Sequence, residues 1–123
     1  MGGNEKEKEY FRKGKKMRSK KFTAIAVKWF DRYNGNTYHS VRIIRHRDNK
    51  ILCCPYEYGY GDQYRQTALE AMSRAKWLPV KYRSHNATHG SNCFDYERAH
   101  NYPIIWAVSD GLKRECVANG ETA

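Results

Sequence analysis

The stretch that most constrains the fold runs over Pro55–Leu78 and reads PYEYGYGDQYRQTALEAMSRAKWL. Tyrosines at alternate positions predict a strand, and the glycines at 59 and 61 predict a turn after it. The residues that follow have helical periodicity, with one apolar face made by Tyr64, Ala68, Ala71, Met72 and Ala75. Asp62 stands where an N-cap residue is needed. The stretch therefore predicts a strand joined tightly to an amphipathic helix.

The chain before this stretch predicts an antiparallel meander. The segments Phe22–Phe30, Thr37–His46 and Ile51–Tyr60 are rich in β-branched and aromatic residues. Asn34-Gly35 separates the first two and is the dipeptide best suited to a tight hairpin, while Asp48-Asn49 separates the second and third. We therefore predict an α+β fold in which one helix packs against a three-stranded antiparallel meander.

The chain after the helix carries a weaker pattern. The segment Tyr82–Arg98 is polar and has no periodicity, so we expect a long loop. Pro103–Val117 predicts a C-terminal β-hairpin, with a strand IIWAV, a turn at Asp110-Gly111 and a partner strand LKRECV. The expected domain organisation is a flexible basic arm over 1–21, a single domain over 22–118 and a frayed tail over 119–123.

The charge of the chain favours a polyanionic partner. The 123 residues carry a formal net charge of +10 and have a pI of about 9.6. Residues 1–21 hold nine Lys/Arg against three Glu, and the remainder holds 14 basic against 10 acidic residues. More than half of the excess therefore lies in the arm, which predicts phosphate contacts that order on binding or a solvated tail.

Membrane and export signals are not expected in this sequence. No run approaches the roughly 18 apolar residues that a membrane span needs, and no apolar segment follows the N-terminal lysines. Cys53 and Cys54 are neighbours and would point to opposite faces of a strand, so the four cysteines are expected to be reduced. We therefore expect a cytoplasmic protein with no membrane partner.

Tyrosines and basic residues alternate along the expected strands and turns. Single-stranded nucleic acid binds such surfaces because bases stack on rings while phosphates pair with cations. Each tyrosine could instead be an ordinary half-buried strand residue. The candidate nucleic-acid or partner-binding residues are Lys15, Lys16, Arg18, Lys20, Lys21, Arg32, Tyr33, Tyr38, Arg42, Arg45, Arg47, Lys50, Tyr56, Tyr58, Tyr60 and Arg65.

Other chemistries have thinner support in the sequence. The spacing of His85, His89 and Cys93 suits zinc, but no second close ligand pair accompanies them, so we expect no metal and no cofactor. Gly59 and Gly61 precede a helix N-terminus, where they could cradle an anion or simply permit the turn.

A nuclease is the remaining catalytic possibility. It could be drawn from His39, His46 and Glu57, although no motif fixes their geometry and no catalytic residue is assigned.

Two resemblances accompany these patterns. The β-β-β-α order with YGYGDQYRQTALEAMSRA resembles the second half of a double-stranded-RNA-binding domain. In that family a lysine cluster at the helix N-terminus grips phosphates, whereas Asp62, Gln63, Tyr64 and Arg65 stand there in this sequence. The phrases NGNTYHSVRI and YGYGDQYRQTALEAM are also similar to those of small uncharacterised phage and prophage accessory proteins. That resemblance implies a viral protein in the host cytoplasm that binds nucleic acid or blocks a host defence complex, such as a CRISPR effector.

The leading hypothesis is a non-enzymatic protein that binds DNA or RNA through the basic arm and an aromatic and basic sheet face. The first alternative is a phage-encoded, anti-CRISPR-like inhibitor that binds a host nucleoprotein complex. The second is a metal-dependent nuclease. The sequence sets no oligomeric state.

Overall fold

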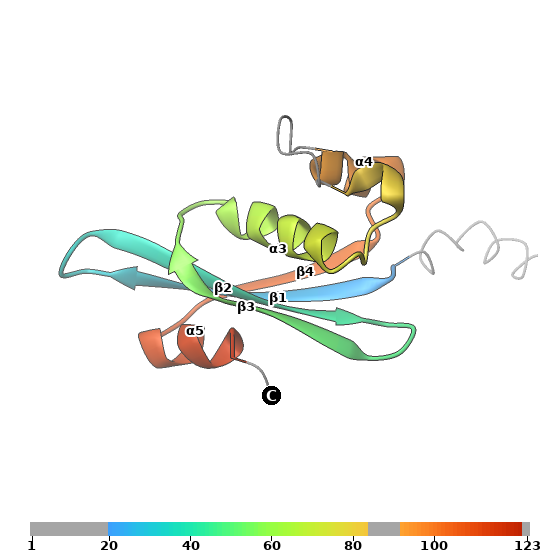
Figure 1. Ribbon diagram of the computed structural model, residues 1–123. Coiled ribbons are helices and arrows are strands. Elements are labelled where there is room, and N and C mark those ends of the chain that lie inside the picture. Colours follow the sequence, from blue (N-terminus) through green and yellow to red (C-terminus); the bar gives the residue numbers. More distant parts are fainter. Residues whose placement is uncertain (1–19, 84–91, 122–123) are drawn as a thin grey trace, which may run out of the picture.

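The computed structural model describes residues 20–83 and 92–121 and has an α+β architecture (Figure 1), as the sequence predicts. Its elements, in chain order, are β1 (Phe22–Asp31), β2 (Asn36–Arg45), β3 (Lys50–Tyr58), α3 (Gln63–Arg74), η1 (Val80–Tyr82), η2 (Asn92–Asp95), α4 (Tyr96–Ala99), β4 (Ile104–Asp110) and α5 (Lys113–Asn119). The four strands form one sheet in the order β3-β2-β1-β4. The arm residues Lys15, Lys16 and Arg18 lie outside the described part of the chain.

The first three strands form the expected antiparallel meander. The first turn contains Gly35 with a φ of +72°, and the second contains Asn49 with a φ of +60°, both in the left-handed region that such turns require. β4 adds to the open side of β1 and runs parallel to it, with Phe22 opposite Ile104. The sheet is therefore mixed.

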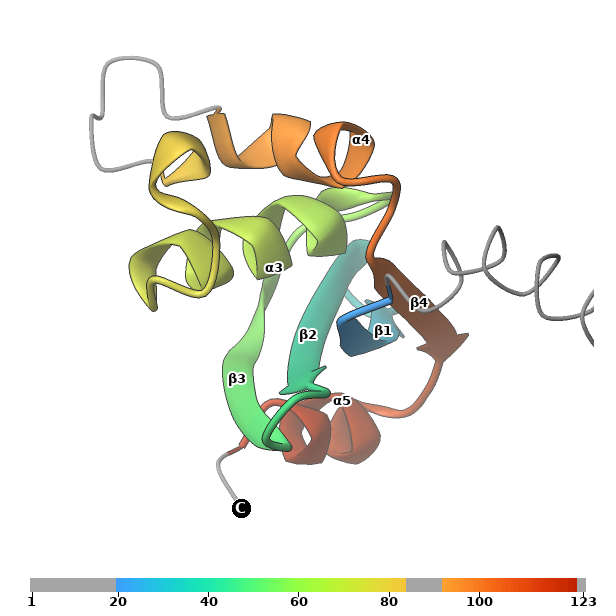
Figure 2. The same ribbon diagram turned by 90° about the vertical axis from the view of Figure 1, so that its right-hand side faces the viewer.

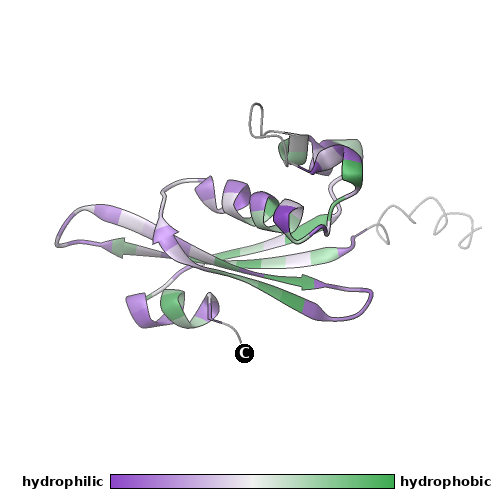
Figure 3. Ribbon diagram, viewed as in Figure 1, coloured by the Kyte–Doolittle hydropathy of each residue, from purple (hydrophilic) through white to green (hydrophobic). Residues whose placement is uncertain are grey.

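The two faces of the sheet are covered by different helices. α3 lies across one face and α5 lies across the other (Figures 1 and 2). The core under α3 contains Ala24, Ala26, Val41 and Ile43 from the strands and Met72 from the helix, all with no exposed surface. Two alanines side by side on β1 leave room for the helix to approach the sheet closely. Figure 3 shows apolar residues recurring along the central strands and polar residues at the turns between them.

The connection from β3 to α3 depends on two glycines. Gly61 has a φ of +64°, which only glycine adopts without strain. A Cβ on Gly59 would lie 2.6 Å from Cε1 of the fully buried His39. Asp62 occupies the expected N-cap position, but its side chain makes no capping hydrogen bond. Gly61 thus permits the backbone turn, and Gly59 permits the close approach of His39.

The predicted C-terminal hairpin is right in its first strand, since IIWAV lies in β4, and wrong in its second: KRECV of the expected partner LKRECV lies in the helix α5, and Leu112 is its N-cap residue. The carboxylate of Glu115 accepts a hydrogen bond of 2.7 Å from the N–H of Leu112, which stabilises the first turn. The helix then docks on the sheet: the hydroxyl of Ser40 donates to the Cys116 carbonyl, and the Asn119 side chain donates to the Ile25 carbonyl at 2.9 Å. These contacts satisfy buried polar groups that a strand would leave unpaired.

The segment expected to be a loop between 82 and 98 contains short helical turns where it is described. Tyr82, Tyr96 and His100 pack their rings together at centroid separations of 4.7–5.8 Å. His85 and His89 lie outside the described residues. Within the described ranges, no helix has the length and apolar character needed to span a membrane.

Candidate nucleic-acid interface

A basic cleft opens at the end of the molecule where β1 begins, β2 ends and the chain leaves α3. Its volume is about 670 Å³. The residues that line it are Lys20, Lys21, Phe22, Arg45, His46, Arg47, Lys76, Trp77, Leu78, Pro79, Arg83, Tyr96 and His100. Six of these are Lys or Arg and none is Asp or Glu. We call this set the basic cleft.

The interior of the basic cleft is apolar. Phe22, Leu78 and Tyr96 are at most 3% exposed. The ring of Trp77 stacks on Phe22 with centroids 5.9 Å apart, and the guanidinium of Arg45 lies 4.5 Å from the Trp77 ring centre. This stacking fixes Arg45 at the mouth of the cleft.

Three cations of the cleft are already engaged. Arg45 forms a two-pronged ion pair with Asp48 at 2.9 and 3.0 Å, which lowers the pKa of that carboxyl to about 2. The ammonium of Lys20 donates to the Tyr102 carbonyl, and Nε of Arg83 donates to the Leu78 carbonyl. These bonds hold the cations in place without neutralising Lys20 or Arg83.

The other three cations are open to an incoming anion. Lys21, Arg47 and Lys76 are exposed and, among the described residues, none of them forms an ion pair. Lys76 follows α3 with a φ of +63°. Three unpaired positive side chains around one opening form an attractive site for phosphate groups.

His46 has a structural role beside the cleft. Its Nδ1 donates to the Lys20 carbonyl at 3.2 Å, so its Nε2 accepts from the Thr23 hydroxyl at 2.8 Å. Both ring nitrogens are therefore used to tie the start of β1 to the end of β2.

A second surface, the aromatic patch, consists of Trp29, Tyr38, Tyr56 and Tyr58. Tyr38 lies at its centre, with ring centroids 5.2, 5.6 and 6.0 Å from those of Trp29, Tyr56 and Tyr58. Tyr56 is 37% exposed and Tyr58 is 56% exposed. The patch lies on the face of the sheet that carries α5, because Trp29 contacts Lys113 of that helix at 5.4 Å.

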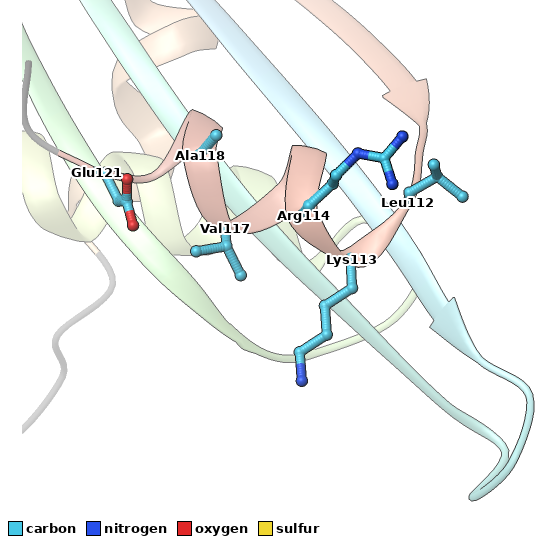
Figure 4. Close-up of a pocket in the computed structure, with 6 residues that line it drawn as sticks. All are labelled: Leu112, Lys113, Arg114, Val117, Ala118 and Glu121. Carbon is cyan, nitrogen blue, oxygen red and sulfur yellow. The ribbon is translucent and has the colours of Figure 1, made fainter.

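The outer side of α5 forms a shallow hollow beside the aromatic patch. Its volume is about 570 Å³, and it is lined by Leu112, Lys113, Arg114, Val117, Ala118 and Glu121 (Figure 4). Lys113 and Arg114 supply the positive charge there, and Glu121 supplies an opposing carboxylate. This hollow is therefore less positive than the basic cleft.

The structure brings only part of the predicted set together. Lys20, Lys21, Arg45 and Arg47 meet in the basic cleft, whereas Tyr38, Tyr56 and Tyr58 meet in the aromatic patch. Arg32 and Tyr33 are exposed in the first turn, and Tyr60 is 66% exposed after β3. Lys50 is exposed at the start of β3.

Two predicted binding arginines are used inside the fold. Arg42 donates to the carbonyls of Ala118, Asn119 and Glu121 at the C-terminal end of α5. Arg65 forms an ion pair with Glu97 at 3.5 Å and lies over the Trp106 ring.

The structure brings only two of the three nuclease candidates together: Oε2 of Glu57 lies 4.0 Å from Nε2 of His39, and both contact the Thr67 hydroxyl, whereas His46 lies elsewhere. His39 is fully buried, where its Nδ1 bonds to the Gly59 carbonyl and its Nε2 to the Thr67 hydroxyl. His46 lies seven residues further along, which is roughly 23 Å along a strand. Among the described residues, no group of three or more His, Cys, Asp or Glu side chains is placed to hold a metal ion.

The sequence analysis missed Lys76, Trp77 and Arg83. A signal for them was present in RAKWLPVKYR, where four cations and two aromatic rings occur within ten residues at and after the end of α3. The mixture of rings and cations predicts a binding surface on strands and turns, whereas this segment follows a helix.

Comparisons with protein-family models, curated proteins and solved structures gave no match. The two resemblances stated from the sequence therefore stay predictions.

Proposed function

We propose that the protein binds nucleic acid non-enzymatically, with the basic cleft contacting the phosphate backbone. The observation that carries this proposal is the lining of the cleft: it contains six Lys/Arg side chains and no Asp or Glu, and within the described part of the chain only one of the six, Arg45, is paired with a carboxylate, that of Asp48. Cations held at a concave surface concentrate a polyanion more strongly than the same charges spread over a convex one. The excess positive charge of residues 1–21, which enter the described chain at Lys20 beside the cleft, supports the same partner.

The arrangement favours sequence-independent binding. Lys and Arg contacts to phosphates position a protein on nucleic acid but do not read the bases. Two rings of the cleft, those of Phe22 and Tyr96, are nearly fully buried, and the half-buried ring of Trp77 stacks on Phe22. Affinity in this proposal comes from phosphate contacts and the counterions that they release.

The test is fluorescence anisotropy with labelled single-stranded and duplex probes of DNA and of RNA, at a low and a physiological salt concentration. We expect binding that weakens steeply with salt, since each neutralised phosphate adds about 0.7 to 0.9 to the slope of log affinity against log salt. Comparable affinities are expected for probes of the same length and different sequence. The proposal fails if no probe binds at low salt, or if binding does not respond to salt.

The aromatic patch supports a second candidate function, an inhibitor that docks on a host protein complex. Exposed tyrosine and tryptophan rings in mutual contact are typical anchors of protein interfaces. The test is a pull-down from host lysate after nuclease treatment, comparing the wild type with Tyr58→Ala. A stoichiometric protein partner that resists nuclease and is lost with Tyr58→Ala would favour the inhibitor over the nucleic-acid binder.

A further inference from the structure

The sheet has two edge strands, β3 and β4, and they differ in how far they can pair with another strand. β3 begins at Lys50, contains Pro55, which has no N–H, and is interrupted by a register shift opposite His39–Val41. The residues after α5 also press against it, since a Cβ on Gly120 would lie 2.6 Å from the Cys54 carbonyl oxygen. Proline, lysine and bulges are the devices that block pairing at a sheet edge.

β4 has none of these devices. It runs from Ile104 to Asp110 as IIWAVSD, with no proline, lysine or arginine. Within the described residues it pairs only with β1, so its outer row of backbone groups has no strand partner. Ile105 is 43% exposed and Val108 is 40% exposed, and Ala107 between them is exposed too. Figure 2 shows β4 at the border of the sheet, beside β1.

We propose that β4 pairs with β4 of a second copy of this chain, antiparallel, which joins two four-stranded sheets into one. A two-fold axis is the symmetry by which identical edges close into a dimer. With the axis at Ala107, Ile105 faces Ser109 of the other copy and Trp106 faces Val108. The smallest side chain thus lies where the two copies come closest, and larger side chains meet smaller ones.

The charges at the two ends of β4 favour this occupant. Asp110, the only charged residue of the strand, stands at its end. At its beginning, the ammonium of Lys20 lies 2.6 Å from the Tyr102 carbonyl, and the N–H of Lys21 donates to the Pro103 carbonyl at 2.7 Å. Antiparallel pairing places Asp110 of each copy opposite Ile104 of the other, so that two strand spacings, roughly 10 Å, separate it from the backbone of these lysines. The β4 edge therefore has a negative charge at one end and positive charges at the other, so a second copy in antiparallel orientation is attracted at both ends. A strand of unrelated sequence would need matching charges of its own.

The proposal does not depend on the proposed nucleic-acid binding, and its test uses the nucleic-acid-free full-length chain. Sedimentation velocity over a wide range of protein concentration should show a reversible monomer–dimer equilibrium. Val108→Lys should shift the equilibrium to monomer, because it places a cation on each side of the two-fold axis. Ile105→Lys, on the opposite sheet face, should do the same. Ile51→Lys is the matched control: Ile51 is 46% exposed on β3, so the same charge change should leave the dimer intact.

Hydrogen exchange completes the test. Amides of 104–110 should exchange more slowly at concentrations where the dimer forms, and thermal unfolding should show that each variant is folded. A wild type that stays monomeric at the highest concentration overturns the proposal. A dimer that survives both Val108→Lys and Ile105→Lys also overturns it, as does a monomer whose β4 amides are already protected, which would show that another segment of the chain covers the edge.

Discussion

The basic cleft and the aromatic patch separate side chains that alternate in the sequence. Tyr38 and Arg45 both belong to β2, but an odd separation of seven residues places them on opposite faces of the sheet and near opposite ends of the strand. Arg42 is an even separation from Tyr38 and shares its face. Its guanidinium, however, is occupied by the carbonyls at the end of α5. Strand periodicity and one helix terminus therefore decide which cations remain open to a partner.

The sequence-based hypothesis placed the rings and the cations on one sheet face, and their separation onto two surfaces changes which part of a nucleic acid each could contact. Rings and cations on one surface would favour stacking of unpaired bases, whereas a cleft with cations at its mouth favours phosphate contacts. In the basic cleft Trp77 already stacks on Phe22 and Arg45. If the protein binds nucleic acid as proposed, the phosphate contacts lie at one end of the molecule, and the aromatic patch is left for another partner.

The largest expected effect is the loss of nucleic-acid binding when the open cations of the basic cleft are reversed. Lys21→Glu, Arg47→Glu and Lys76→Glu combined should weaken binding at least about 100-fold, since charged hydrogen bonds contribute about 1.5–3 kcal/mol each and the new carboxylates repel phosphate. Anisotropy at low salt measures the change. All three positions are exposed, so thermal unfolding should be little changed. Wild-type affinity in the folded variant would break the comparison.

Arg42→Ala should lower the free energy of unfolding by about 1–3 kcal/mol. That substitution leaves three carbonyls at the end of α5 without their donor. Urea unfolding measures the loss. Arg47→Ala is the matched control, and it should alter stability by less than about 0.5 kcal/mol because its side chain is exposed.

The order of the two arginine variants should be reversed when nucleic-acid affinity is measured in place of stability. Arg47→Ala should weaken nucleic-acid binding, whereas Arg42→Ala should leave it unchanged. If Arg42→Ala weakened binding more than Arg47→Ala, the partner would lie on the α5 face.

A gain in binding is expected for Asp48→Asn. The substitution removes the carboxylate that neutralises Arg45 and so raises the net charge beside the cleft by one. Binding should tighten roughly two- to fivefold at low salt, and the salt slope should rise by about one. Anisotropy at neutral pH measures both values, and unchanged binding would show that Arg45 does not contact the ligand.

The ion pair between Arg45 and Asp48 also predicts how the stability of the protein depends on pH, which gives a test of the pair that needs no nucleic acid. The pKa of Asp48 is lowered from its usual 3.8 to about 2, so the folded protein holds this proton less tightly than the unfolded chain. The stability that the pair contributes is therefore fully present above pH 3.8 and is lost as the pH falls towards 2. Thermal unfolding of wild type and Asp48→Asn should differ by a constant amount above that range and converge within it.

The smallest expected effect belongs to the aromatic patch. Tyr58→Ala should change nucleic-acid affinity by less than about twofold, because the proposed phosphate contacts lie in the basic cleft. If the Tyr58 ring stacked on a base, its loss would instead cost about 1–3 kcal/mol. The ring is 56% exposed, so the fold should tolerate its loss. A tenfold loss in anisotropy titrations would show that bases do reach the patch.

The meander and α3 could be predicted because their signals are local. Asn34-Gly35 and Asp48-Asn49 specify the turns, and the spacing from Tyr64 to Met72 specifies the buried side of the helix. The helix α5 was missed: Gly120 at its end is an ordinary helix boundary signal, but its N-cap residue is Leu112, whose side chain cannot cap a helix, so the start signal is weak. What decides its structure is docking on Ile25 and Ser40, far away in the sequence.

The parallel pairing of β4 with β1 joins Phe22 to Ile104 across most of the chain, and no local pattern specifies such a contact. Only part of the basic cleft could be predicted, because some of its residues also meet through contacts between segments that are far apart in the sequence. Lys21 was predicted as part of the basic arm, and Arg45 was predicted from the mixture of rings and cations along the strands. Lys76 and Arg83 reach the cleft only because the chain turns back after α3 over the ends of β1 and β2.

The salt dependence of binding in two charge-matched triple variants tests the location of the site most directly. Lys21→Ala, Arg47→Ala and Lys76→Ala remove three cations from the basic cleft, and Arg32→Ala, Lys113→Ala and Arg114→Ala remove three from the neighbourhood of the aromatic patch. If the cleft binds phosphates, the slope of log affinity against log salt should fall by about three in the first variant and stay within about one of the wild type in the second. Equal slopes in the two variants, or a larger fall in the second, would contradict the assignment of phosphate binding to the basic cleft.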